Sequence, residues 1–395
     1  MSEISERSKH RVQILTDYML GLIKGKHGKE LLNRYKILET SFIPSDILPV
    51  FDSLFERSID IEKIKSASNK LFNILYTQFS NYPEIRYDSE SIIYLLMQDN
   101  RGVEKQLENL KEYIKKINKE IDAEVKTELV KGFEKISEFT VHYTVKENII
   151  FPELEKLWNN YQCIKLMWSF HDDIRRNIKK ILKILKSDTI NMDLLNKLIS
   201  KVYFNVNTII FREEKVLFPV MYSTVNKEVM DKMLYQVKEF DLLYADTKII
   251  KEQKEDTHHN KRIIKLSTGE LTLEQLELVF RHLPVDITFV DENDTVKYFS
   301  DPETRVFPRT VSIIGRKVQN CHPHESVDIV NKIIESFRKG EKDSASFWLE
   351  LGNKFVLIKY FAVRDRESNY RGVLEVTQEI SEIKKLKGQK RLLDW

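Results

Sequence analysis

Two histidines and one glutamate lie within helical patterns of apolar residues, where imidazole and carboxylate groups could bind a metal. His142, His171 and Glu213 share the phase of the apolar residues around them, so we expect all three side chains to point inward. An inward acid and an inward imidazole on such helices could build a metal site.

A repeated motif accompanies two of these residues. The stretch KENIIFP at 146–152 is echoed by REEKVLFP at 212–219, and both contain an acid, two spacers, an aliphatic residue, Phe and Pro. The repetition predicts two equivalent helices that end their regular run in the same way.

The segments around these residues are helical in pattern. Residues 10–80 form short amphipathic helices, and residues 88–255 form four or five long ones with short connections and almost no glycine. We expect the long helices at 89–121, 124–158, from 164, 193–221 and 227–251. Short connections are typical of antiparallel helical bundles.

The period of the pattern changes from helical to two after the charged stretch at 251–262. Two strands around an acidic turn at 291–294 precede a helix at 323–340, and three adjacent strands follow. This order of elements predicts an α+β domain.

Composition limits the classes of function. The chain has 395 residues, which favours two or three domains, and its 64 basic and 61 acidic residues leave a formal charge of +3. A dedicated nucleic-acid binder would show a clustered basic excess. No apolar run approaches the roughly 20 residues of a membrane helix, the N-terminus lacks a signal-peptide pattern, and the two cysteines are far apart. We therefore expect a cytoplasmic protein that binds neither nucleic acid nor membrane.

The chain resembles two known families. The motifs HYTVKENIIFP, LMWSFHDDIR and FREEKVLFP resemble those of the second, third and fourth helices of the hemerythrin-like (HHE cation-binding) family. The β-β, helix, β-β-β order ending in GVLEVTQEI resembles a PAS sensor domain. The whole chain is similar to a prokaryotic group that joins a small helical module, a hemerythrin-like bundle and a PAS domain.

The fold class implied is mainly α, an N-terminal helical module and a hemerythrin-like four-helix bundle followed by an α+β PAS domain. The expected parts are a helical module at 1–84, the bundle at 85–256, a linker at 257–271, the PAS domain at 272–382 and a C-terminal helix at 383–395.

The hemerythrin resemblance implies a carboxylate-and-histidine metal centre, and the chain departs from the pattern at several positions. The family has a Glu four residues after the His that corresponds to His142, where this chain has Lys146. Glu147, one residue further, is rotated by about 100° and is the less favoured ligand. The other two family histidines fall at Ile209 and in the stretch SESIIY, at Ser91 or Tyr94.

Three of six ligand positions therefore remain, and two outcomes stay open. His142, His171 and Glu213 hold one Fe or Zn ion, or the bundle is metal-free and the Lys146 ammonium substitutes for the cation beside Glu213. In the PAS domain, Cys321 and His322 precede a helix. Three interpretations stay open. These residues bind haem, a metal or another small ligand, or the Cys321 thiol senses redox state, or they only cap the helix.

The favoured function is a sensor or regulatory protein that detects a small ligand, gas or redox signal and acts through an unknown partner protein, as a homodimer. One alternative is a non-haem iron enzyme or repair protein acting on NO, peroxide or iron–sulfur centres. The other is a structural interaction protein with a decayed site.

Overall fold

The computed structural model describes residues 2–159, 161–245, 247, 263–302 and 305–389. The chain divides into two compact units, Met1–Gln253 and Lys254–Trp395, and each is described by itself. None of the helices in these described ranges has the length and apolar character needed to cross a membrane.

The N-terminal helices belong to the same unit as the bundle. They are α1 (Ser2–Ile23), α2 (Gly28–Arg34), a 3-10 turn (Pro44–Asp46), α3 (Ile47–Glu56) and α4 (Ile61–Ser80). Arg11 on α1 pairs with the buried Asp46 carboxylate at 2.6 Å and thereby holds the first helix against the 3-10 turn. One continuous apolar core runs from Leu15 on α1 to Ala245, so this module and the bundle pack as one body.

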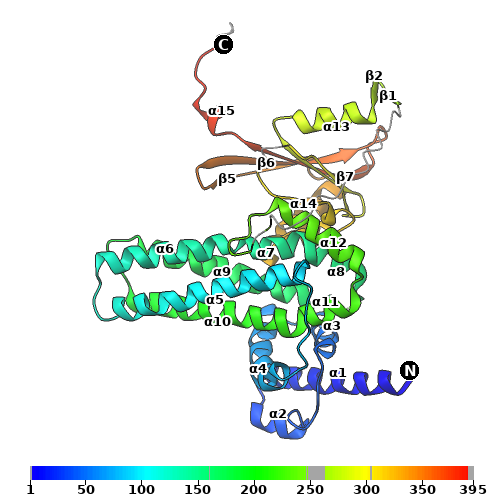
Figure 1. Cartoon of the computed structure of the whole chain (residues 1–395). Coiled ribbons are helices and arrows are strands. Elements are labelled where there is room, and N and C mark those ends of the chain that lie inside the picture. Colours follow the sequence, from blue (N-terminus) through cyan, green and yellow to red (C-terminus); the bar gives the residue numbers. More distant parts are fainter. Residues whose placement is uncertain (1, 160, 246, 248–262, 303–304, 390–395) are drawn as a thin grey trace. The chain divides into compact units, whose positions relative to one another are not determined.

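Four long helices form the bundle, and they lie alongside one another in Figure 1. They are α5 (Ile92–Ile117), α6 (Ala123–Phe139), α9 (Cys163–Leu185) and α10 (Met192–Arg212), with α12 (Lys227–Gln236) after them. Side chains cap three of their N-termini: Ser91 accepts from Tyr94 N–H, Asp122 from Glu124 N–H, and Asn191 from Leu194 N–H. These caps fix where each helix begins, which in turn fixes which residues face the interior.

The echoed motif has a common structural cause. A π-helical turn at Lys146–Ile150 separates α7 (Val141–Val145) from α8 (Phe151–Leu157), and another at Glu213–Leu217 separates α10 from α11 (Phe218–Thr224). Pro152 and Pro219 lack the N–H that an α-helix requires, and their rings crowd the preceding turn, so the wider turn accommodates them. The prediction of two equivalent helix ends is confirmed.

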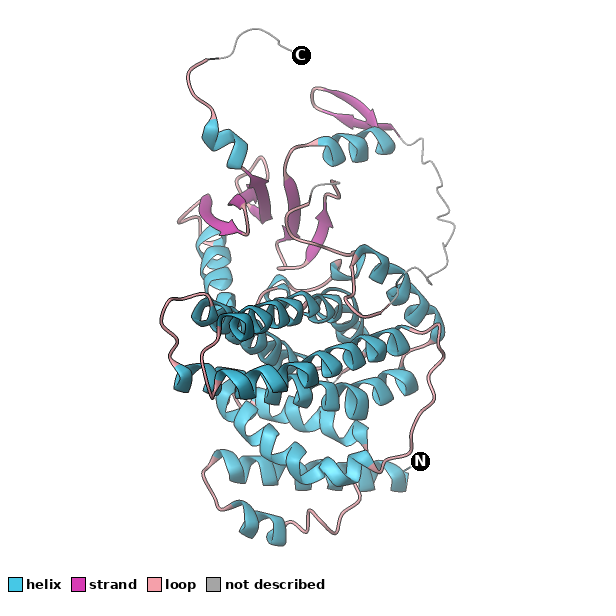
Figure 2. Ribbon diagram, turned by 60° about the vertical axis from the view of Figure 1, so that its left-hand side comes forward, coloured by secondary structure: helices cyan, strands magenta, loops and turns pink. Residues whose placement is uncertain are grey.

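The second unit contains a five-stranded antiparallel sheet in the order β4-β3-β7-β6-β5, with strands coloured magenta in Figure 2. The strands are β3 (Asp286–Asp291), β4 (Val296–Phe299), β5 (Ser344–Leu351), β6 (Lys354–Arg364) and β7 (Tyr370–Glu379). Helix α14 (His324–Arg338) packs on the sheet through Ile334 and Phe337. Gly372 has φ +137°, and a Cβ there would lie 2.1 Å from the Val290 carbonyl oxygen, so β7 approaches β3 only with glycine at this position.

Two segments differ from the expected elements. The part of the expected linker that the structure describes forms a hairpin, β1 (Ile263–Leu266) and β2 (Gly269–Thr272), which leads into α13 (Leu273–His282). Thr272 and Gln275 form a capping box that starts α13, a local signal absent from a simple linker. Of the expected C-terminal helix, only α15 (Ser381–Lys385) is helical in the described residues, and 390–395 lie outside them.

Asp52 on α3 gives a pH-dependent prediction for stability. Its Oδ1 accepts the Gln162 N–H at 2.7 Å while Oδ2 is buried without a partner, and burial raises its pKa to about 6. The native state therefore retains the proton longer than the unfolded chain, and this carboxyl's contribution to stability falls as pH rises from about 4 to about 6. In Asp52→Asn we expect the free energy of unfolding at pH 8 to rise by about 1–3 kcal/mol, after allowance for solvent screening.

Urea denaturation of both proteins at pH 4.5 and pH 8 measures this effect. The difference in the free energy of unfolding between Asp52→Asn and the parent should be larger at pH 8. The exposed Asp188→Asn is the control and should leave the comparison unchanged. Equal stability of Asp52→Asn and the parent at pH 8 would contradict a buried, partly unsatisfied carboxylate.

Candidate functional site

His142, His171 and Glu213 all lie inside the bundle, as their phase predicts. Each side chain is fully buried. His142 comes from α7, His171 from α9, and Glu213 from the start of the second π-helical turn. The structure brings His142 and Glu213 together, whereas His171 has different partners.

His142 bridges two carboxylates. Its Nδ1 lies 3.0 Å from Asp99 Oδ2 on α5, and its Nε2 lies 3.3 Å from Glu213 Oε2. Both ring nitrogens of His142 therefore already have a protein partner. Asp99 is held in turn by the Tyr244 N–H, which donates to Oδ1 at 2.7 Å.

Lys146 forms an ion pair with Glu213 inside the bundle, which confirms the predicted contact between these residues. Asn100 Nδ2 donates to Glu213 Oε2 at 3.2 Å, and the Tyr143 ring lies 4.6 Å from the Lys146 ammonium. Burial lowers the pKa of Lys146, although Glu213 opposes this effect. Burial alone raises the pKa of Glu213, but Lys146 and His142 outweigh it and hold that pKa below its usual range. The ammonium and the carboxylate therefore stabilise each other as a charged pair.

His171 belongs to a second cluster. Its Nδ1 lies 2.8 Å from Glu147 Oε1, and both oxygens of Glu147 accept from Arg175 at 2.9 Å. The Tyr143 ring stacks on the imidazole at 4.2 Å with an interplanar angle of 7°. Burial, with Lys146 and Arg175 adding to it, holds the pKa of His171 well below its usual range. The neutral ring donates from Nδ1, and its Nε2 is buried without a partner.

Glu147 departs from the position that regular helix geometry predicts. An α-helix rotates it by about 100° from Lys146 and away from the centre, yet its carboxylate is buried against His171. Glu147 lies within the π-helical turn Lys146–Ile150, whose wider geometry changes the direction of each side chain. Glu147 binds His171 and Arg175.

The residues of α5 that face the centre also differ from those expected. Ser91 is the N-cap of that helix and Tyr94 is 37% exposed, so neither lies at the centre. Asp99 and Asn100 take part instead, and both are fully buried. Asn100 stands four residues after Leu96, in phase with the apolar face, and this polar interruption is the sequence signal that locates it.

A pocket in the second unit lies between α14 and the sheet and encloses about 30 Å³. Its wall is apolar apart from His322, Tyr360 and Glu375; the apolar members are Val290, Val318, Val330, Ile333, Ile334 and Val373. His322 Nδ1 donates to the Val318 carbonyl at 2.8 Å, and burial lowers its pKa. The neutral ring therefore presents Nε2 as an acceptor. Cys321 packs against the apolar core of the second unit, but it does not line the pocket.

Comparison with known families identifies both domains. Residues 91–221 match the hemerythrin HHE cation binding domain, and residues 276–381 match a PAS domain. The chain carries a hemerythrin HHE domain and a PAS domain. Together these two domains support a sensory role.

Several solved structures are similar to parts of the chain. A C-terminal domain from Streptococcus mutans is 38% identical over 32% of this chain and 99% of its own, with a TM-score of 0.31. A sensory box sensor histidine kinase from Vibrio cholerae is 14% identical over 26% of this chain and 87% of its own, with a TM-score of 0.21. The sensor region of a sensor histidine kinase is 13% identical over 25% of this chain and 40% of its own, with a TM-score of 0.19. No curated protein matches.

The HHE domain implies a cation site, and the residues at its centre do not fit one. His142 faces carboxylates with both nitrogens, and Lys146 already supplies Glu213 with a positive charge. Arg175 neutralises Glu147 in the same way. A dication needs deprotonated ligands with excess negative charge, and within the described residues no three His, Cys, Asp or Glu side chains form a set that could hold a metal ion. Among the described residues at the bundle centre, the buried Nε2 of His171 has no hydrogen-bond partner and could accept one from a ligand.

The PAS domain does not fit a haem either. A space of about 30 Å³ admits one or two water molecules and is far too small for a porphyrin. His322 is therefore suited to accept a hydrogen bond from a small molecule rather than to bind haem iron.

Proposed function

We propose that this protein is a sensor whose PAS pocket binds a small molecule, while its HHE bundle is a metal-free core held by an internal cation. The observation that carries the proposal is the Lys146–Glu213 ion pair at the bundle centre, because it gives the HHE fold a protein-supplied cation. The signal then enters through the PAS domain, where a pocket combines apolar walls with a few polar groups.

The pocket lining defines the class of ligand. Apolar side chains from α14, β3 and β7 favour an apolar body, whereas His322 Nε2 and the Glu375 carboxylate are hydrogen-bond acceptors. Arg309 Nη2 lies 3.8 Å from Glu375 Oε1, so a positive group stands beside this carboxylate. We propose a small, mainly apolar molecule that carries an N–H or O–H donor. A ligand larger than the enclosed space would have to move α14 away from the sheet, and such a movement is a means of transmitting the signal.

A test with small heteroaromatic compounds addresses the PAS site. Indole, imidazole and phenol combine a compact apolar body with one donor, and each is larger than the space of about 30 Å³, so its binding requires α14 to move from the sheet. We expect at least one of them to raise the melting temperature of the full chain saturably. Val330→Phe and Ile333→Phe fill the pocket from α14 and should abolish that rise. Ile329→Phe is the matched control, since this neighbouring side chain is 49% exposed and does not line the pocket. Equal responses of the filled and control variants would refute binding at this site.

Metal analysis of the purified full chain separates this function from the alternatives. We expect less than stoichiometric iron or zinc, even after incubation with either ion, because the donor set is already neutralised. Two irons per chain would instead favour a non-haem iron enzyme, and one metal would favour mononuclear sensing in the bundle. Metal-free protein with no response in the PAS test would favour a structural interaction protein.

A further inference from the structure

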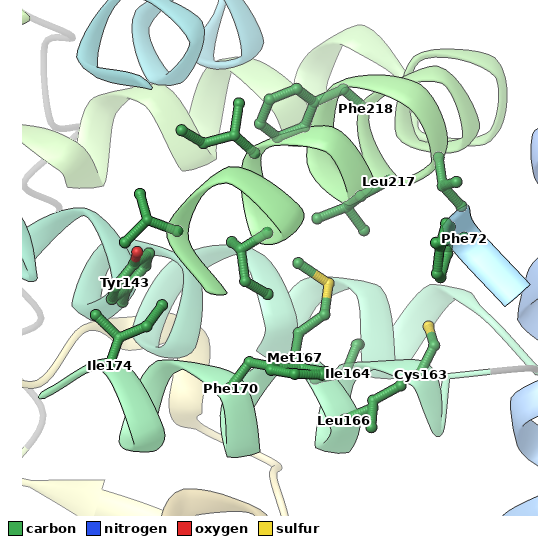
Figure 3. Packing of buried hydrophobic residues seen from close by; sticks show 14 of the residues in the cluster. Phe72, Tyr143, Cys163, Ile164, Leu166, Met167, Phe170, Ile174, Leu217 and Phe218 are labelled. Carbon is green, nitrogen blue, oxygen red and sulfur yellow. The ribbon is translucent and has the colours of Figure 1, made fainter. Parts of the chain in front are cut away.

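A cavity of about 30 Å³ lies in the first unit, where the N-terminal helices meet the bundle. Helix α3 contributes apolar side chains to its wall, α4 contributes Phe72, α9 contributes Cys163 and Met167, and the second π-helical turn contributes Val216 and Leu217. Figure 3 shows the side chains of Phe72, Cys163, Met167 and Leu217. The cavity therefore forms only where the N-terminal helices and the bundle come together.

The wall of this cavity offers a water molecule no hydrogen bonds. Nine of its ten residues are apolar, with Cys163 counted among them, and the tenth is Arg212. The Nη2 of Arg212 donates to Ser68 and Asn69 on α4, and its Nε and Nη1 are buried, so these nitrogens add no polar surface to the wall. Burial raises the pKa of the Cys163 thiol to about 12, so this residue stays uncharged.

The lining of this cavity differs from that of the PAS pocket, which encloses a similar volume. The PAS pocket includes His322 and Glu375, which accept hydrogen bonds from a ligand. A water molecule stays in a cavity only where about two to four polar groups hold it, and an apolar cavity stays dry. The cavity of the first unit therefore selects against every molecule that needs hydrogen bonds.

We infer that this cavity binds one small, uncharged apolar molecule of the class of the dissolved gases, and binds it without a metal. Space of about 30 Å³ admits a molecule of about two or three heavy atoms. The sulfur atoms of Met167 and Cys163 are polarisable, and the flexible Met167 side chain can adapt to the guest. The guest supplies the dispersion contacts that the wall lacks while the cavity is empty. This site is separate from the proposed PAS function and lies in the other unit.

The position of the cavity gives gas binding two structural consequences. A guest contacts side chains of α3 and α4 on one side and of α9 on the other, so it stabilises the contact between the N-terminal helices and the bundle. Val216 and Leu217 belong to the π-helical turn that begins at Glu213, the partner of Lys146. The guest and the central ion pair thus share one turn of backbone.

Xenon is the probe for this site, because it is uncharged, apolar and polarisable. Xenon NMR of the full chain under increasing xenon pressure should show a saturable change in chemical shift, with a rise in melting temperature over the same pressures. Ile333→Phe, which fills the PAS pocket, should keep this saturable change. Loss of the change in Ile333→Phe would assign the xenon site to the PAS domain and overturn the inference, as would the absence of saturable binding in the parent.

Variants that fill the cavity locate the site. Cys163→Val and Val216→Ile each add roughly the volume of one methyl group to the wall, and both should abolish the saturable change. Val216→Ile keeps the thiol and carries the comparison if Cys163→Val does not fold. Cys321→Val is the matched control, since Cys321 lines neither cavity, and it should bind xenon as the parent does. Parent-like xenon binding in a folded, cavity-filled variant would overturn the inference.

Discussion

Lys146→Met is expected to lower the free energy of unfolding by about 3–5 kcal/mol, the usual cost of removing one partner of a buried ion pair. Methionine retains the unbranched apolar stem of Lys146, so the loss comes mainly from the charge. Glu213 would remain fully buried with Asn100 and His142 but without the ammonium that offsets its desolvation. Urea denaturation at pH 7 measures the change.

Lys131→Met is the matched control for this experiment. Lys131 pairs with Glu128 at 2.7 Å on the surface of α6, and its side chain is 62% exposed. An exposed pair of this kind contributes at most about 1 kcal/mol. Adding Glu213→Gln to Lys146→Met should recover part of the loss, because the uncompensated charge is then removed. Similar stabilities of Lys146→Met and Lys131→Met would mean that the central ion pair does not hold the bundle.

The spacing of residues along each helix predicted which side chains point into the bundle centre. His142, His171 and Glu213 share the period of their apolar neighbours, which was enough to predict that they point inward. The Lys146–Glu213 contact followed from the same argument, since Lys146 stands one turn after His142. These predictions succeeded because regular helices convert residue spacing directly into direction.

The failures lie where the helix is irregular or where polar residues interrupt an apolar face. Glu147 faces His171 because a π-helical turn begins at Lys146, and an assumption of regular α-helix placed it elsewhere. Asp99 and Asn100 were missed because the family pattern directed attention to a stretch that begins at the helix cap. Two adjacent polar residues in phase with Leu96 would have indicated them. Arg212 Nε and Nη1 are buried without a hydrogen-bond partner. The sequence could not predict this, because it depends on which side chains fill the space around the guanidinium.

Lys146→Glu is expected to convert the bundle centre into a site that takes up one Zn(II) or Fe(II) ion per chain. The change replaces a positive charge with a negative one, so the cluster of Asp99, His142 and Glu213 gains two units of negative charge. A dication offsets the two added negative charges, and the His142 ring can bind it through Nε2 only where that nitrogen carries no proton. The new carboxylate would stand one helical turn after His142 and next to Glu213, and the unpartnered Nε2 of His171 is a further donor.

Metal content by mass spectrometry after dialysis, and calorimetric titration with Zn(II), measure the gain. Lys146→Gln is the matched control, because it removes the ammonium with a side chain of similar length to Glu and adds no carboxylate. If removal of the cation were sufficient, both variants would bind metal alike; if the added carboxylate is required, only Lys146→Glu binds. We expect only Lys146→Glu to bind, with release of protons that makes its affinity rise with pH. Absence of metal in both variants would mean that His142, Glu213 and the new carboxylate do not form a metal site. The charge of Lys146 would then not be what keeps a cation out of this bundle.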